Sequence, residues 1–250
     1  MTGASGAIGS AVRLHLSDQY ALSCLTRRPA AFESHVADLT DLEQILPAFA
    51  GTDAVVHLAA SSSVDADWDD VLANNVVGTR NVFEAARRSG VRRVVFASSN
   101  HAIGMYEVDG APAIYELDDP RVYDESVPVR PDSPYGVSKA FGEAIGRMYS
   151  DVHGIDVICL RLGSVRPGAE STTGDGASQH EPVLQPGDTR RRLRATWLSY
   201  RDCARLIARA LDADVRWAIV YGISNNPRQF WDLRGARDLL GYEPEDAAPR

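Results

Sequence analysis

Short apolar segments alternate with amphipathic segments along most of the chain. The apolar runs are rich in β-branched residues, which is typical of strands buried on both faces, and cover residues 20–25, 54–59, 93–97 and 157–162. The segments between them repeat apolar positions at helical spacing and cover residues 7–16, 42–49, 75–89 and 135–152. Strands that alternate with helices predict an α/β fold, in which a doubly wound parallel sheet carries helices on both faces.

Two long stretches of the chain and its C-terminal part are less regular. Residues 107–134 and 166–189 are rich in turn-forming residues and are predicted to be long loops. The pattern then predicts a helix, a strand and a final helix, over residues 201–213, 218–223 and 233–241. Gly241 marks the end of the last helix, with Pro244 following.

Composition narrows the class of protein. The 250 residues are 44% hydrophobic, which suits one domain, or one domain with a small appendage. The net charge of −8 argues against a nucleic-acid partner. No apolar run is long enough for a membrane span and no signal segment opens the chain, so we expect a cytoplasmic protein. The widely spaced Cys24, Cys159 and Cys203 indicate core thiols, and no metal site is expected.

A glycine-rich turn opens the first predicted helix. Gly3, Gly6 and Gly9 have GxxGxxG spacing, which lets a backbone approach a pyrophosphate at a helix N-terminus, although such turns also occur without a ligand. A strand normally precedes this turn, and here only Met1 does, so we expect the first strand to be truncated. The predicted cofactor contacts lie in this turn and after the later strands of the sheet. They are Gly3, Ser5, Gly6, Ala7, Ile8, Asp38, Leu39, Leu58, Ala59, Ala60 and Asn75.

Lys139 is the only lysine among 26 basic residues. Tyr135 lies four residues before it, so both side chains share one helical face. A nearby ammonium favours the phenolate, which predicts that Lys139 lowers the pKa of Tyr135 and prepares it to exchange a proton with a substrate hydroxyl. Ser99 follows a predicted strand and can hydrogen-bond the reacting oxygen, although a Ser-Ser turn can also be a helix cap. The predicted catalytic residues are therefore Tyr135, Lys139 and Ser99. Tyr135 and Lys139 are also predicted to contact the cofactor.

These motifs together resemble the extended short-chain dehydrogenases, the epimerase/dehydratase family, over essentially the whole chain. The resemblance implies a Rossmann-type dinucleotide-binding domain over residues 1–165, with the Tyr/Lys helix, and a small substrate-binding portion over residues 166–250 that returns one strand to the sheet. It implies an NAD- or NADP-dependent oxidoreductase. Thr26 stands where NAD-selective relatives carry an acid, and Arg27 and Arg28 follow it, so NADP is slightly favoured and Arg27 is a predicted cofactor contact.

Narrower resemblances point to the substrate. Residues 97–104, 161–164, 196–199 and 221–226 are similar to uronate dehydrogenases, and residues 197–203, 220–224 and 240–244 to haloarchaeal NAD-dependent glucose-6-phosphate dehydrogenases. Both groups oxidise the anomeric carbon of a sugar to a lactone, which implies a hexuronate as first choice and a hexose 6-phosphate as second. The substrate contacts carried over by this resemblance are Ser63, Ser99, Asn100, His101, Ser164 and Arg192. The cluster around Arg192 is also open to interpretation as a solvated face.

Two other functions stay open. A nucleotide-sugar epimerase or dehydratase shares the Tyr/Lys pair, but the tail after Thr196 is short for holding a nucleotide diphosphate. A non-catalytic NADP-binding regulator would not need the proton relay of Tyr135, Lys139 and Ser99. The sequence leaves the exact sugar open, and also whether the chain forms a homo-oligomer.

Overall fold

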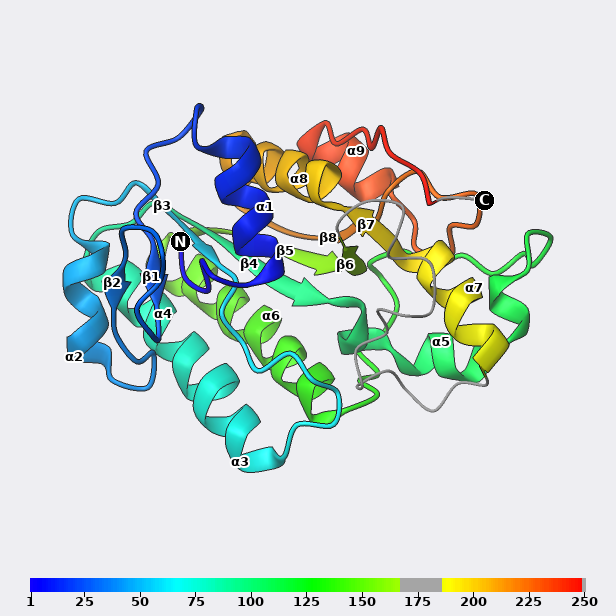
Figure 1. Ribbon diagram of the computed structural model, residues 1–250, viewed down its shortest axis with the longest axis horizontal. Coiled ribbons are helices and arrows are strands. Elements are labelled where there is room, and N and C mark those ends of the chain that lie inside the picture. Colours follow the sequence, from blue (N-terminus) through cyan, green and yellow to red (C-terminus); the bar gives the residue numbers. More distant parts are fainter. Residues whose placement is uncertain (167–185, 249–250) are drawn as a thin grey trace.

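The computed structural model describes residues 1–166 and 186–248 as a parallel sheet between layers of helices (Figure 1). The strands of this part are β1 (Leu25–Thr26), β2 (His35–Val36), β3 (Ala54–His57), β4 (Arg93–Ser99), β5 (Asp156–Leu162), β6 (Ser164–Arg166), β7 (Trp197–Ser199) and β8 (Trp217–Gly222). Its α-helices are α1 (Ala7–Leu16), α2 (Leu42–Ile45), α3 (Trp68–Val71), α4 (Gly78–Arg88), α5 (Met105–Gly110), α6 (Pro134–His153), α7 (Pro186–Thr196), α8 (Tyr200–Asp212) and α9 (Arg234–Leu240). Helical turns of other pitch are η1 (Leu46–Phe49), η2 (Leu72–Val77), η3 (Asn100–Ile103) and η4 (Ala113–Tyr115).

The main sheet is parallel throughout, and its order is β2-β1-Thr2-β3-β4-β5-β8. Thr2 joins the two halves, because it forms parallel bridges to Leu25 of β1 and to His57 of β3. The Leu25 N–H donates to the Met1 carbonyl at 2.8 Å, and the Thr2 N–H donates to the Val56 carbonyl at 3.0 Å. The predicted doubly wound fold is confirmed, and the bridge residue Thr2 lies between β1 and β3, at the point where the strand order reverses.

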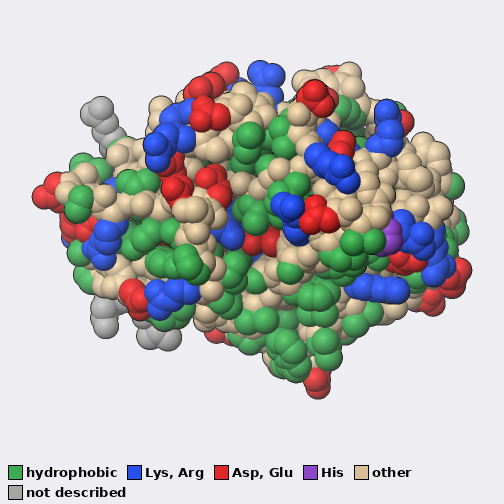
Figure 2. All heavy atoms as spheres, turned by 180° about the vertical axis from the view of Figure 1, so that it is seen from behind, with side chains coloured by type: hydrophobic (Ala, Val, Ile, Leu, Met, Phe, Trp, Pro, Cys, Tyr) green, Lys and Arg blue, Asp and Glu red, His purple; other side chains and the backbone are tan. Residues whose placement is uncertain are grey.

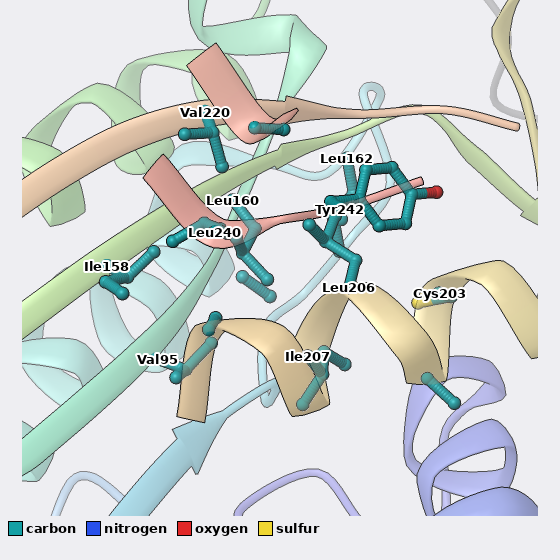
Figure 3. Close-up of a cluster of buried hydrophobic side chains, with 14 of the residues drawn as sticks. Val95, Ile158, Leu160, Leu162, Cys203, Leu206, Ile207, Val220, Leu240 and Tyr242 are labelled. Carbon is teal, nitrogen blue, oxygen red and sulfur yellow. The ribbon is translucent and has the colours of Figure 1, made fainter. Parts of the chain in front are cut away.

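Both faces of the sheet are buried. Val95 of β4 and Ile158 of β5 pack with side chains of α1, α8 and α9 (Figure 3). Val94 and Val157, one residue earlier in each strand, point to the opposite face and pack with α2, α4 and α6. This two-sided burial explains why the strands are continuous apolar runs in the sequence.

The C-terminal part of the chain packs on this frame in two ways. β8 pairs with β5 as the edge strand of the main sheet, whereas β6 and β7 form a separate two-stranded parallel sheet. A third apolar cluster joins η3, η4 and α7 to the segment after β8, with Ile103, Tyr115, Ala195 and Trp231 among its members. The chain after residue 186 therefore contacts the segment that directly follows β4.

Predicted and observed boundaries agree best for α1, where they are identical, and for α6 and β5. The predicted strand over 20–25 is wrong in extent, because it pairs with only Thr2 on one side and with the two residues of β2 on the other, so that pairing is limited to the end of that run. The helix predicted over 42–49 is divided into α2 and η1, where Pro47 enters the first turn of η1.

Three further predicted segments differ from the structure. The helix predicted over 75–89 begins earlier, with the wide π-helical turn η2 ahead of α4. The predicted loop over 107–134 contains the end of α5 and all of η4, which the third apolar cluster holds in place. In the predicted loop over 166–189, α7 already begins at Pro186, and residues 167–185 lie outside the described residues.

The surface carries both signs of charge. On the face shown in Figure 2, acidic and basic side chains are interspersed rather than gathered into one basic area. Exposed ion pairs such as Arg147–Asp151, at 2.6 Å, also join charges of opposite sign. Among the described helices, none is both long and apolar enough to cross a membrane.

Candidate active site

A cavity of about 420 Å³ lies at the carboxyl ends of the central strands, a volume typical of ligand sites. Glycine-loop, strand-end and α6 residues line it together, at the reversal of strand order where doubly wound sheets bind their ligands. The sequence-predicted residues in its lining are Gly3, Ser5, Gly6, Ala7, Ile8, Arg27, Asp38, Leu39, Leu58, Ala59, Ala60, Ser99, Tyr135 and Lys139.

The glycine turn has the shape of a phosphate cradle. Gly3 has φ +65°, and a Cβ there would lie 2.7 Å from the Ala59 nitrogen, so only glycine fits between the turn and the end of β3. A Cβ on Gly6 would meet nothing closer than the Gly3 carbonyl oxygen at 3.4 Å. Gly6 is also the N-cap of α1 and provides no side-chain cap, so the first N–H groups of this helix are left for an anion. The residues present therefore fit a pyrophosphate.

The end of the cavity away from Tyr135 and Lys139 suits the adenosine part of a dinucleotide. The Asp38 carboxylate accepts hydrogen bonds from the Thr40 backbone N–H at 2.9 Å and from its hydroxyl at 2.8 Å, which lower the pKa of Asp38. The Arg27 guanidinium donates to Asn74 Oδ1 at 3.2 Å, and Asn74 Nδ2 donates to Asp70 at 2.7 Å. Asp70 and Asn74 line the cavity but were not predicted, although their spacing of four residues places them on one helical face.

Asn75 is the one predicted cofactor contact outside the cavity lining. Its side chain is buried, accepts the Ser61 N–H at 2.7 Å, and donates to the Ser61 carbonyl at 2.9 Å and to the Ser138 hydroxyl at 3.0 Å. Asn75 therefore supports the loop after β3, and its contact with the cofactor stays a prediction.

The three predicted catalytic side chains converge at the other end of the cavity. Tyr135 and Lys139 project from the first turns of α6, which Ser133 caps by accepting the Gly136 N–H at 3.1 Å. Lys139 is 3% exposed, and its Nζ donates to the Ala97 carbonyl at 2.6 Å and lies 5.4 Å from the centre of the Tyr135 ring. Ser99, the last residue of β4, accepts the His101 N–H at 3.2 Å.

The ionisation of the Tyr/Lys pair differs from the expectation. Burial raises the pKa of Tyr135 to about 12, and the hydrogen bond with Ser99 offsets only part of this rise. Burial lowers the pKa of Lys139 to about 8. In this structure the pKa of Tyr135 is therefore raised and not lowered as predicted, because the loss of hydration dominates at both groups and the ammonium bonds the Ala97 carbonyl.

Burying Lys139 has a measurable cost in stability. With a folded-state pKa of about 8 against an unfolded value of 10.5, the unfolded chain holds a proton between these pH values that the folded chain has lost. The free energy of unfolding should therefore rise with pH across this window, by up to about 3 kcal/mol at 1.36 kcal/mol per pKa unit. Denaturant titrations at pH 7.5 and 9.5 should show this rise in the wild type and its absence in Lys139→Met. Parallel pH profiles in the two proteins would contradict the assignment.

Adding a side chain at Gly9 should affect both dinucleotide binding and the stability of the fold. A Cβ at this position would lie 2.6 Å from the carbonyl oxygens of both Gly3 and Ala4. Gly9→Ala should therefore displace the turn, weaken dinucleotide binding at least tenfold by calorimetry, and destabilise the fold by about 1–3 kcal/mol. Gly6→Ala is the matched control, because its Cβ has room within the protein but enters the cradle. It should weaken dinucleotide binding without lowering the melting temperature, and equal destabilisation by both variants would contradict this distinction.

A buried ion pair beneath the catalytic residues was not predicted. Glu143, one helical turn after Lys139, accepts two hydrogen bonds from Arg161 of β5, both at 2.9 Å, and one from Ser98 at 2.7 Å. Arg161 and Glu143 are 2% and 4% exposed. The only sequence signal is that Tyr135, Lys139 and Glu143 share one face of α6 at four-residue spacing.

The predicted substrate contacts lie beside the cavity and, Ser99 apart, not in its lining. The Ser63 hydroxyl accepts the Asp65 N–H in a local turn at 3.1 Å, and the Ser164 hydroxyl is 3.0 Å from that of Thr196. Asn100 is buried and donates to Glu107 at 3.4 Å. The remaining two contacts, His101 and Arg192, each pair with a carboxylate.

Arg192 is buried and already has an anionic partner. Its Nε lies 2.7 Å from the Glu107 carboxylate, and the two side chains are 4% and 5% exposed. The Tyr115 hydroxyl donates to the same carboxylate at 2.8 Å. The interpretation of this arginine as part of a solvated face is therefore wrong, and any ligand anion at Arg192 would share it with Glu107.

The comparisons with known proteins agree with this geometry. Residues 1–220 match the model of the NAD dependent epimerase/dehydratase family. The chain is 40% identical to the NAD-dependent glucose-6-phosphate dehydrogenase of Haloferax volcanii, over 98% of this chain and 92% of that protein. It is 37% identical to the L-arabinose 1-dehydrogenase (NAD(P)(+)) of the same organism, over 98% and 95%.

A solved structure is similar over the same length. The crystal structure of uronate dehydrogenase from Agrobacterium tumefaciens has a TM-score of 0.79 and 33% identity, and the match covers 99% of this chain and 84% of that one. Together with the glycine turn, the cavity at the carboxyl ends of the strands and the Tyr/Lys helix, these matches show that the chain belongs to the NAD dependent epimerase/dehydratase family.

Proposed function

We propose that the protein is an NAD(P)-dependent aldose dehydrogenase that oxidises the anomeric carbon of a hexuronate to its lactone. The observation that carries this proposal is the convergence of Ser99, Tyr135 and Lys139 at one end of a cavity whose other end fits a dinucleotide. Similarity to three kinds of sugar dehydrogenase over nearly the full chain supports the reaction type.

Each side chain of the site has one role in this reaction. When bound, the nicotinamide supplies the acceptor for the hydride that leaves the sugar carbon. Tyr135 Oη takes the proton of the anomeric hydroxyl, and the Ser99 hydroxyl orients the reacting oxygen. Lys139, fixed by the Ala97 carbonyl, holds a positive charge beside the Tyr135 ring and stabilises the phenolate form of Tyr135, which is the form that takes this proton. The glycine turn and the N-terminus of α1 hold the pyrophosphate.

Arg192 is the proposed contact for the anionic end of the sugar. A guanidinium can bind a carboxylate through two parallel hydrogen bonds, which fixes the direction of the substrate. Because the Glu107 carboxylate shares this guanidinium, the pair favours a monoanion such as a hexuronate over the dianion of a sugar phosphate. Hexose 6-phosphate remains the second candidate, since the 40% identical relative bears that name.

A panel of sugars tests this proposal directly. Reduction of NAD and of NADP is followed with glucuronate, galacturonate, glucose 6-phosphate, glucose and L-arabinose. The proposal predicts the highest kcat/KM with a hexuronate. Faster turnover of the phosphate or of either neutral sugar would replace the hexuronate, and cofactor binding without turnover would favour the regulator.

The Arg192 contact is tested in a charge-balanced pair of variants, because Arg192→Gln alone would leave Glu107 buried without its cation. Arg192→Gln combined with Glu107→Gln should raise KM for the hexuronate at least tenfold, while residual activity on neutral glucose changes little. Equal loss of both activities would remove Arg192 from the substrate site.

Cofactor preference gives a separate prediction. Arg27 lines the cavity at its adenine end, and a guanidinium there suits a 2′-phosphate, so NADP is expected to be used at least as well as NAD. Arg27→Ala should lower kcat/KM for NADP about tenfold and leave kcat/KM for NAD within a factor of two. Arg28→Ala is the neighbouring control and should change neither value. A wild-type preference for NAD that Arg27→Ala does not alter would contradict the role of this arginine.

A further inference from the structure

His101 and Asp132 form a second side-chain pair beside Tyr135. His101 Nδ1 lies 2.7 Å from Asp132 Oδ2, and the two side chains are 14% and 7% exposed. The His101 ring meets the Tyr135 ring edge-on, with 5.8 Å between their centres. The pair connects η3, which follows Ser99, to the residues immediately before the catalytic helix α6.

Ser133 and Gly104 hold the Asp132 carboxylate in place against His101. The Ser133 hydroxyl donates to Asp132 Oδ1 at 2.9 Å, so the second carboxylate oxygen is also engaged. Gly104 faces the carboxylate, and a Cβ there would lie 1.9 Å from Asp132 Oδ2. The chain thus has a glycine where any side chain would push the carboxylate away from His101.

One imidazole nitrogen remains for a ligand. Asp132 occupies Nδ1, and among the described residues no group bonds Nε2. A carboxylate at one ring nitrogen favours the proton on that nitrogen and determines what the other nitrogen can do. With the proton on Nδ1, a neutral His101 presents Nε2 as a hydrogen-bond acceptor.

We propose that Asp132 is a positioning residue that holds His101 in the Nδ1–H tautomer, so that Nε2 accepts a hydrogen bond from a sugar hydroxyl next to the one that Tyr135 deprotonates. This inference rests on the proposed function for the identity of the ligand, a polyhydroxylated sugar. The tautomer itself does not depend on that function. Asp132 acts only through His101, whereas Tyr135 acts on the reacting oxygen.

The tautomer is read by ¹⁵N-¹H correlation spectra of the histidine rings, at pH 8 and without sugar. Loss of one spin system of six in His101→Phe assigns the signal. The wild type should show Nδ1–H, and both Asp132→Asn and Gly104→Ala should move His101 toward Nε2–H. Protonation of Nε2 in the wild type, alone or together with Nδ1, would overturn the proposal even if no sugar is turned over.

Kinetics with the sugar that the panel selects then test the consequence. Asp132→Asn and Gly104→Ala should each lower kcat/KM by about 10- to 100-fold, the range for lost carboxylate–histidine contacts, and leave the Kd of the dinucleotide within twofold. In the His101→Phe background, Asp132→Asn should cost less than a further twofold. A full additional loss in that background would show that Asp132 does not act through His101.

Asp109→Asn is the matched control, since Asp109 pairs with Arg130 on an exposed surface nearby and should leave both the tautomer and kcat/KM unchanged. Absence of turnover with every sugar would refute the proposed function, while the spectra would still decide the tautomer.

Discussion

Tyr135→Phe is expected to lower kcat by a factor on the order of 10² or more while the Kd of the dinucleotide stays within about twofold. The ring still packs against His101 and lies under the Lys139 ammonium, so the loss is confined to the hydroxyl that takes the proton. Stopped-flow reduction of the cofactor gives the rate of the chemical step, and calorimetric titration gives the binding constant.

A second tyrosine provides the control for this experiment. Tyr149 lies on the same helix, is buried, and donates to Glu84 at 3.1 Å, away from the cavity lining. Tyr149→Phe should leave kcat unchanged. Near-normal turnover by Tyr135→Phe, or equal losses in the two variants, would remove Tyr135 from its assigned role.

Glu143→Leu is expected to destabilise the fold by about 3–5 kcal/mol, because it leaves the Arg161 guanidinium buried without its anion. Combining it with Arg161→Met should restore most of this loss, since replacing a buried ion pair with apolar residues is often neutral or stabilising. Chemical denaturation of the single and double variants measures both effects.

An exposed ion pair on the same helix calibrates the result. Arg147 and Asp151 are 55% and 52% exposed, so Asp151→Asn should change the free energy of unfolding by less than about 0.5 kcal/mol. If Glu143→Leu were as mild as Asp151→Asn, the buried pair would not be holding α6 against β5. A double variant less stable than Glu143→Leu would equally contradict the charge argument.

Much of the fold could be predicted from local patterns. Helix α1 and strand β5 carry their signals in their own residues: a glycine turn and helical spacing in one, and a continuous apolar run in the other. The extent of β1 could not be predicted in this way, because it depends on pairing with Met1 and Thr2, which are distant in sequence. The segment containing α5 and η4 resembles a loop by composition, and only its burial against Trp231 and Phe230 makes it helical.

In the candidate site, too, the residues with a local sequence signal could be predicted and those that depend on tertiary contacts could not. The glycine turn and the Tyr135/Lys139 pair have short, fixed spacings and could be found by inspection. Glu107 and Asp132 are far in sequence from the residues that they pair with, so no motif reveals them. The pKa of Tyr135 also could not be predicted from spacing, because the position of the ammonium and the loss of hydration are properties of the folded chain. The sequence therefore located the groups that are proposed to react, and the structure added the carboxylates that pair with their neighbours His101 and Arg192.

The central claim is that the anomeric carbon of a hexuronate is oxidised. It is tested most directly by following a hexuronate labelled with ¹³C at C1 by NMR, with either cofactor in slight excess. The account predicts that the anomeric signals give way to a single lactone carbonyl signal, and that one reduced cofactor forms for each sugar consumed. An unchanged C1 signal, or a rearranged sugar formed without net cofactor reduction, would contradict it.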